Sequence, residues 1–160
     1  MPEIMIAKTP ADLPDRATLL SMSGMAYMQA MLDGQMPQPT MSPLMGCWLH
    51  SAEPGRVCAR GIPTFVHTNP FGAVHGGWYG ALLDMALGCT VMTMVPQGRW
   101  YTTLEYKVNL TRALPLGTEV EAQGIIDHVG RSTAVAHATL RGCADGRIYA
   151  TGSTTCIILD

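Results

Sequence analysis

The sequence predicts an α+β fold in which one long, buried helix lies against an antiparallel sheet. The first observation is an apolar run from Trp78 to Val95, which contains a single charged residue, Asp84. A helix that is apolar nearly all round is typical of a protein interior. The second observation is that residues 101–159 read as successive strands without helices between them. Strands grouped in this way are typical of α+β proteins.

The composition fits a single domain with one sizeable core and excludes several classes of function. The chain has 160 residues, of which 14% are charged, against about 25% in ordinary soluble domains. Much of the surface is therefore expected to be hidden in the core or in subunit contacts. The formal net charge of −2 and the absence of a basic patch argue against binding to nucleic acid.

Membrane insertion, secretion and metal binding are not expected either. No uninterrupted apolar run reaches the ~18 residues of a membrane span. The N-terminus lacks the basic start and apolar stretch of a signal peptide. The five cysteines are scattered, with no Cys-x-x-Cys pair and no spacing typical of metal ligands. We therefore expect reduced cysteines that serve packing, no metal, and a cytoplasmic location.

Residues 1–43 are expected to form a helical extension, and residues 44–160 the main domain. A helix is predicted from Pro14 to Asp33, because proline suits a first helical position and Gly34 suits the residue just past a helix end. The segment 34–43 is rich in proline and is expected to be neither helix nor central strand. Short strands are expected near residues 44–50, 56–62 and 63–68.

The segment after the apolar run alternates with a period of two, the pattern of a half-buried strand. The alternation puts Leu104, Tyr106 and Leu110 on one face and Thr103 on the other, polar face. Three more strands are expected at residues 118–129, 132–144 and 146–159. A bulge is expected at Gly124 in the first of them, and the last two are joined by hairpin residues at Ala144–Gly146.

Two features, one just before the apolar run and one within it, indicate a catalytic site. His75, Gly76 and Gly77 precede it, and the first N–H groups of a helix have no internal partner and carry positive partial charge. Such a group can stabilise a carbonyl oxygen that gains negative charge. Asp84 is either a functional carboxylate with a raised pKa or a structural acid that neighbouring hydroxyls satisfy. Because His75 and Asp84 are nine residues apart, they point to opposite sides of a helix and could meet only from different subunits.

The stretch NPFGAVHGGWYGALLDMALG, residues 69–88, resembles the Asn-x-x-Gly-x-x-His-Gly-Gly-(x6)-Asp signature of hotdog-fold acyl-CoA thioesterases, and most of all the phenylacetic acid degradation branch. Residues 101–117 and 128–140 resemble that family's long strand and following hairpin, so the similarity extends from about Gly46 to the C-terminus. The resemblance implies a hotdog fold, with a long central helix wrapped by a curled antiparallel sheet. It also implies a homodimer, often a dimer of dimers, with active sites at the dimer interface.

The resemblance also implies roles for individual residues. Asp84 matches the catalytic carboxylate, as general base or as nucleophile, and the Gly76 N–H matches the group that polarises the thioester carbonyl. Asn69 would orient water or substrate, His75 would help to hold the site, and Thr103 matches a hydroxyl on the long strand.

No cofactor is implied beyond the coenzyme A of the substrate. The groups expected to contact the substrate and its phosphates are the Gly77 backbone, Lys107, Arg112 and Arg131.

Two other functions stay open at this point. Hydratases and dehydratases share the hotdog fold and pair a histidine with an acid, although the Asp-x-Asn-x-x-His run of that type is absent. A non-catalytic module that binds acyl-CoA is the other alternative. The acyl group could be aromatic or of medium chain length. Its pocket is expected to use Phe71, Trp78, Tyr79 and the methionines of the first helix, since methionine-rich walls adapt to several shapes.

Overall fold

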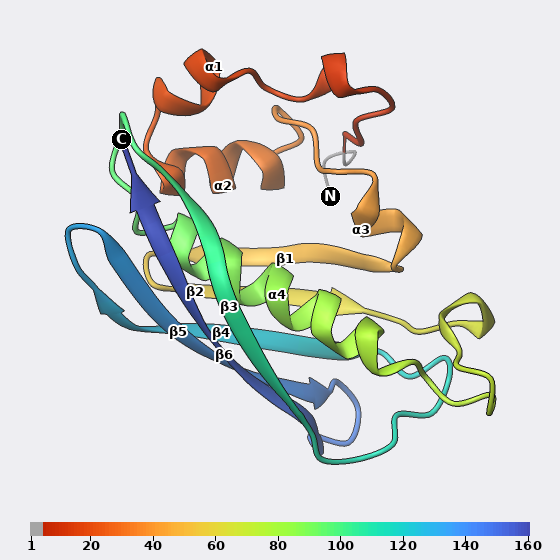
Figure 1. Ribbon diagram of the computed structural model, residues 1–160. Helices are drawn as coiled ribbons and strands as arrows, with labels where there is room; N and C mark the ends of the chain where they lie inside the picture. Colours follow the sequence, from red (N-terminus) through yellow and green to blue (C-terminus); the bar gives the residue numbers. More distant parts are fainter. Residues whose placement is uncertain (1–4) are drawn as a thin grey trace.

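The computed structural model describes residues 5–160, in which a six-stranded antiparallel sheet curls around one long helix, α4 (Gly76–Met92) (Figure 1). The strands are β1 (Cys47–Glu53), β2 (Arg56–Gly61), β3 (Trp100–Leu110), β4 (Val120–Val129), β5 (Thr133–Gly142) and β6 (Ile148–Leu159). They lie in the order β1-β2-β4-β5-β6-β3, and α4 contacts all six. The α+β prediction is confirmed, with the central helix of a hotdog fold. None of the helices in residues 5–160 is long and apolar enough to cross a membrane.

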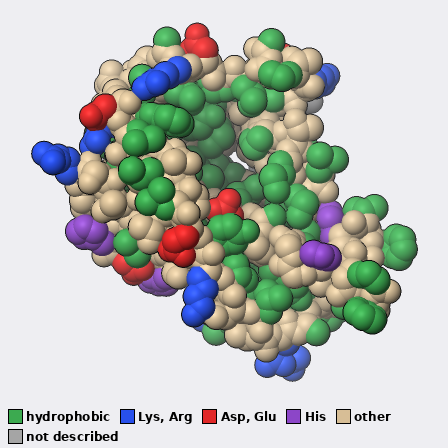
Figure 2. Space-filling model, viewed as in Figure 1, with side chains coloured by type: hydrophobic (Ala, Val, Ile, Leu, Met, Phe, Trp, Pro, Cys, Tyr) green, Lys and Arg blue, Asp and Glu red, His purple; other side chains and the backbone are tan. Residues whose placement is uncertain are grey.

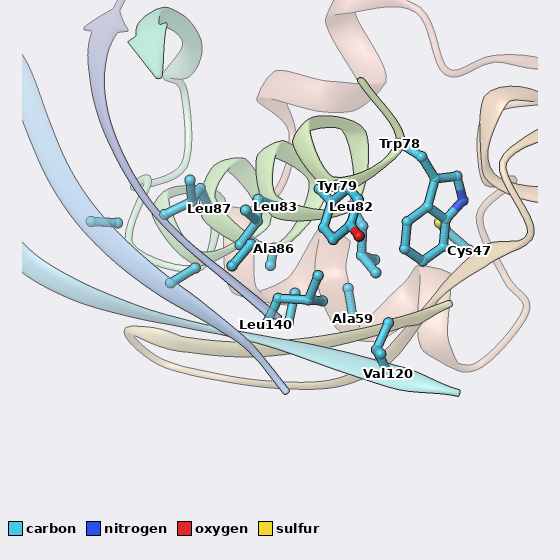
Figure 3. Close-up of a cluster of buried hydrophobic side chains, with 14 of the residues drawn as sticks. Cys47, Ala59, Trp78, Tyr79, Leu82, Leu83, Ala86, Leu87, Val120 and Leu140 are labelled. Atoms are coloured by element: carbon cyan, nitrogen blue, oxygen red, sulfur yellow. The ribbon is translucent and has the colours of Figure 1, made fainter. Parts of the chain in front are cut away.

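The core lies between α4 and the sheet. Leu82, Leu83 and Leu87 are fully buried between α4 and the sheet. Figure 3 shows Ala59 and Leu140 below the helix, beneath these leucines. Burying a leucine side chain contributes about 1.5–3 kcal/mol, so this face of α4 supplies a large part of the stability of the fold. The run predicted for the helix extends three residues too far, because α4 ends at Met92 and Thr93 caps it.

A second face of α4 carries glycines and lies against β3. The points where β-carbons would stand on Gly76 and Gly80 are each 3.3 Å from a β3 side chain, Leu110 and Tyr106 respectively. Gly88 lies in the same way against Tyr101. Asp84 occupies the position between Gly80 and Gly88 on this face, since residues four apart lie one above the other on a helix. The glycines on either side of Asp84 therefore let the β3 tyrosines pack close to the helix.

The strand β3 contains a bulge that the alternation did not reveal. Thr103 pairs with Cys156 and Glu105 with Thr155, so Leu104 is an extra residue in the ladder. Because of this extra residue, the alternation of side chains facing toward and away from the helix is shifted by one position after the bulge. Tyr106 and Leu110 face the helix as predicted, but Thr103 also faces it, and Leu104 is 58% exposed. The prediction of one apolar and one polar face along the whole strand was therefore wrong at its first half.

The bulge expected at Gly124 lies elsewhere, between Ile126 and His128. A β-carbon on Gly124 would stand 2.2 Å from Oγ1 of Thr90 in α4. The lack of a side chain at Gly124 therefore lets α4 and β4 approach closely, and the strand ladder is not interrupted there.

The part of the chain before α4 departs from the prediction in three places. The single helix expected before Gly34 is two helices, α1 (Arg16–Leu20) and α2 (Gly24–Leu32), because the Ser23 side chain accepts a hydrogen bond from Ala26 N and begins a new helix. The proline-rich segment contains a short helix, α3 (Met41–Leu44), with proline in its first turn, where no N–H is needed. Residues 63–68 form no strand; they contain a 3₁₀ turn at Phe65–His67.

Candidate active site

Asp84 lies in the middle of α4 and opens onto a cavity of about 250 Å³. The walls come from α4, from β3 and from the segment around α3. Figure 2 shows a hollow on this side of the molecule, with hydrophobic side chains on much of its surface. The residues that line the cavity are Pro39, Met41, Ser42, Met45, Cys47, Ala81, Asp84, Met85, Gly88, Cys89, Tyr101 and Thr103.

The Asp84 carboxyl is the one acidic or basic side chain among those lining residues. Its Oδ1 atom is buried and has no hydrogen-bond partner within residues 5–160. Burial raises the pKa of Asp84, and hydrogen bonding with the Thr103 hydroxyl offsets part of that rise. Burial and the nearby Asp84 charge raise the pKa of Cys89 to about 12, so its thiol stays neutral. Asp84 is therefore a carboxyl group at the wall of a mostly apolar cavity whose hydrogen-bonding capacity is only partly used within the described residues.

The first turn of α4 is set by His75, the residue before the helix. Its Nδ1 accepts a hydrogen bond from the Gly77 N–H at 2.9 Å, which satisfies one of the free donors of the helix start. In the described part of the chain, the Gly76 N–H has no acceptor. Of the two glycines, Gly76 therefore keeps the donor that could polarise a carbonyl oxygen.

Asn69 shapes the loop that leads into α4. Its side-chain oxygen accepts hydrogen bonds from the N–H groups of Phe71 (2.9 Å) and Ala73 (3.2 Å). Gly72 lies inside this tight loop with φ +77°, a conformation that favours glycine. The Asn69 oxygen is thus occupied by the loop itself, and its amide nitrogen is the atom left for water or substrate.

Within one chain the predicted site residues form two separate groups. Asp84 and Thr103 share one cavity, whereas His75 and Gly77 line another, next to His67 and Trp78. Asp84 is eight positions after Gly76, which corresponds to about 12 Å along the helix. A single carbonyl group cannot contact the Gly76 N–H and the Asp84 carboxylate of the same chain at that separation.

The three basic residues expected at the phosphates are also spread out. Arg112 follows β3 near the start of α4, where its carbonyl accepts a hydrogen bond from the Tyr79 hydroxyl at 3.5 Å. Lys107 is exposed in β3, and Arg131 lies in the turn between β4 and β5, beside Arg99 at the other end of β3. Because β3 has 11 residues, its two ends are about 30 Å apart. Arg112 and Arg131 of one chain therefore cannot hold the same phosphate.

The expected aromatic residues do not line the cavity beside Asp84. Trp78 and Tyr79 are core residues, 1% and 4% exposed, and donate hydrogen bonds to backbone carbonyls. Phe71 is 93% exposed. No sequence pattern indicated the residues that replace them, Ser42 and Met45, because they lie in and just after α3 and reach α4 only through the tertiary fold.

Comparisons with known proteins place the chain in a family. Residues 71–156 match the family model described as the thioesterase superfamily. Among solved structures, the chain is similar to a phenylacetic acid degradation-related protein from Ralstonia eutropha JMP134, with TM-score 0.75, 26% identity, and coverage of 82% of this chain and 98% of that one. It is also similar to thioesterase superfamily member 2 of zebra fish, with TM-score 0.64, 26% identity, and coverage of 70% and 80%.

A third structure, a mutant of the phenylacetic acid degradation protein PaaI from Thermus thermophilus, has TM-score 0.67 at 24% identity, and coverage of 73% of this chain and 96% of that one. It shows the shared fold. No curated protein sequence matches the chain.

Proposed function

Because the chain belongs to the thioesterase superfamily, we propose that it hydrolyses acyl-CoA thioesters and that Asp84 is its catalytic carboxylate. The family and the thioesterases among its structural relatives support thioester hydrolysis in general. The observation that carries the finer proposal is the position of Asp84, which lines a mostly apolar cavity while its buried Oδ1 atom has no hydrogen-bond partner in residues 5–160. Burying a carboxylate group without a hydrogen-bond partner destabilises the folded state, so its presence favours a functional role.

Two routes use the same geometry. As a general base, Asp84 removes a proton from water while the water oxygen bonds to the thioester carbon. As a nucleophile, its own oxygen bonds to that carbon and gives a mixed anhydride, which water then hydrolyses. In both routes the carbon–sulfur bond breaks and coenzyme A leaves as a thiolate. The Gly76 N–H is the proposed donor to the carbonyl oxygen as it gains negative charge.

The separation of Asp84 and Gly76 within one chain supports a site shared between two copies. We propose a homodimer as the smallest active unit, in which Asp84 and Thr103 of one protomer meet Asn69, His75 and Gly76 of its partner. In a two-fold dimer each of the two sites would have this same composition.

The test is thiol release from phenylacetyl-, benzoyl-, hexanoyl-, decanoyl- and crotonyl-CoA. Asp84→Asn is expected to lower turnover by roughly 10²–10⁴, as for loss of a general base. Glu105→Gln is the matched control, because it removes an exposed carboxylate on β3 that lies outside the cavity. Near wild-type turnover by Asp84→Asn would refute the site. Loss of crotonyl-CoA without thiol release would instead indicate a hydratase.

A further inference from the structure

A second cavity, of about 200 Å³, lies next to the one at Asp84. It is enclosed by α1 and α2 on one side and by the end of α4 and the start of β3 on the other. Two residues, Cys89 and Tyr101, belong to the walls of both cavities. The lining residues of the second cavity are Leu19, Tyr27, Met28, Met31, Cys89, Met92, Arg99, Trp100 and Tyr101.

The chemistry of the second cavity suits an alkyl group. Three of its wall residues are methionines, which are flexible and adapt to the shape of an apolar ligand. Its one charged wall residue, Arg99, is already paired, since its Nε lies 2.8 Å from Oδ1 of Asp160. Burial raises the pKa of Tyr101 well above its ordinary value, so the phenol adds no charge.

The position of α2 above this cavity is fixed. The Gly24 N–H donates a hydrogen bond to the Val95 carbonyl at 2.9 Å. A β-carbon on Gly24 would stand 1.8 Å from the Met92 carbonyl oxygen, so the start of α2 lies directly against the end of α4. Met28 and Met31 follow one and two turns later and are buried against this part of the molecule.

The stretch of α4 that lines the two cavities has the length of a medium acyl chain. From Asp84 to Met92, α4 advances about 12 Å. An extended alkyl chain of roughly ten carbon atoms has about that length, given carbon–carbon bonds of about 1.5 Å. A phenylacetyl or butyryl group bound at Asp84 would end in the first cavity and leave the second one unused.

We propose that the two cavities form one acyl channel, which passes between Cys89 and Tyr101, and that the substrates are unbranched acyl thioesters of roughly eight to twelve carbon atoms. This inference rests on the proposed function, because it names the substrate class of the Asp84 site. Met31 on α2 is then a specificity-determining residue, although it lies outside the site where the thioester bond breaks.

The first experiment measures kcat/KM across acyl-CoA substrates from butyryl to palmitoyl, with phenylacetyl-CoA added. The wild type is expected to show its highest kcat/KM with substrates in the range from octanoyl-CoA through dodecanoyl-CoA. Met31→Trp, which fills the second cavity, should lower kcat/KM for decanoyl-CoA about tenfold or more and change that for butyryl-CoA by no more than about twofold. Met31→Ala should move the preference toward longer chains. Ala26→Trp is the matched control, because Ala26 is exposed on the same helix, and it should leave the profile unchanged.

Several results would overturn the proposal. They are a preference of the wild type for butyryl- or phenylacetyl-CoA, an equal loss for all substrates in a folded Met31→Trp protein, or an unchanged profile in both variants. Circular dichroism establishes whether Met31→Trp folds; if it does not, the profile of Met31→Ala decides.

A second measurement separates the channel from catalysis. S-decyl- and S-butyl-coenzyme A are thioethers that cannot be hydrolysed, and calorimetry gives their Kd values. Tighter binding of the decyl compound, reduced in Met31→Trp, supports the channel even if no thioester is hydrolysed and the proposed function fails. Equal binding of both compounds by the wild type overturns the channel whatever the activity is.

Discussion

The Tyr101 hydroxyl lies 2.8 Å from the point where a β-carbon on Gly88 would stand. A side chain at this position would displace the aromatic ring that forms part of both cavity walls. Gly88→Ala is therefore expected to cost about 1–2 kcal/mol of unfolding free energy relative to Gly80→Ala. At Gly80 the nearest atom is 3.3 Å away, and both variants gain the same helix propensity. Urea unfolding measures the difference, and equal stabilities would show that the Tyr101 ring moves freely.

The pH dependence of turnover should report the environment of Asp84. Its pKa is raised above the ordinary value of 3.8 by burial, and the Thr103 hydroxyl opposes the rise. Since a base or nucleophile must be ionised, kcat/KM should fall as the pH drops through that raised pKa. Thr103→Val removes a group that favours the ionised form, so its acid limb should lie at higher pH than in the wild type. Thr102→Val, an exposed neighbour, is the control and should not shift the limb; no shift in either variant would remove Thr103 from the site.

The same raised pKa predicts a stability cost. The folded state binds the Asp84 proton more tightly than the unfolded chain does, so this carboxyl makes the protein less stable as the pH rises from 3.8 through the raised pKa. Asp84→Asn removes the charge and should raise Tm at neutral pH. The gain should shrink when both proteins are compared in acid, below the ordinary aspartate pKa. A lower Tm for Asp84→Asn at neutral pH would mean that the ionised carboxylate is stabilised by a partner group.

A mixing experiment tests the shared site. Asp84→Asn and Asn69→Ala are each expected to be nearly inactive alone. After the two are unfolded, combined in equal amounts and refolded, half of the dimers contain one copy of each. If each site combines Asp84 of one protomer with Asn69 of the other, such a dimer has one intact site, and activity should recover to about a quarter of the wild-type level. No recovery, with mixed dimers confirmed by mass spectrometry, would place the whole site within one chain.

The parts of the fold that could be predicted are those where one local pattern decides. The apolar run indicated α4 and singled out Asp84, and turn residues separated the strands of the C-terminal half. Gly146 with φ +65° and Gly34 with φ +70° stand where the hairpin and the helix end were expected. Each of these predictions depends on neighbours in sequence alone.

The parts that could not be predicted depend on contacts between distant segments. Alternation does not show where an extra residue enters a strand. The bulge at Leu104, which puts Thr103 on the side that faces the helix, could therefore not be predicted. Ser23 begins a second helix, whereas the prediction rested on Pro14 and Gly34, which mark only the outer ends of the segment. The cavity wall formed by Ser42 and Met45 exists only because α3 and the residue after it lie across the cavity from α4 in the folded chain.

Two of the helices that line the acyl channel, α4 and α2, differ in their distance from the carboxyl group of Asp84. α4 is held between the sheet and the site, so a change there disturbs the core and the chemistry together. α2 packs against β1 and the end of α4, and it lines only the far end of the channel. Substitutions on α2 can therefore alter the range of substrates while the reaction is retained, which makes this helix the natural place for related enzymes to diverge and for protein engineering to begin.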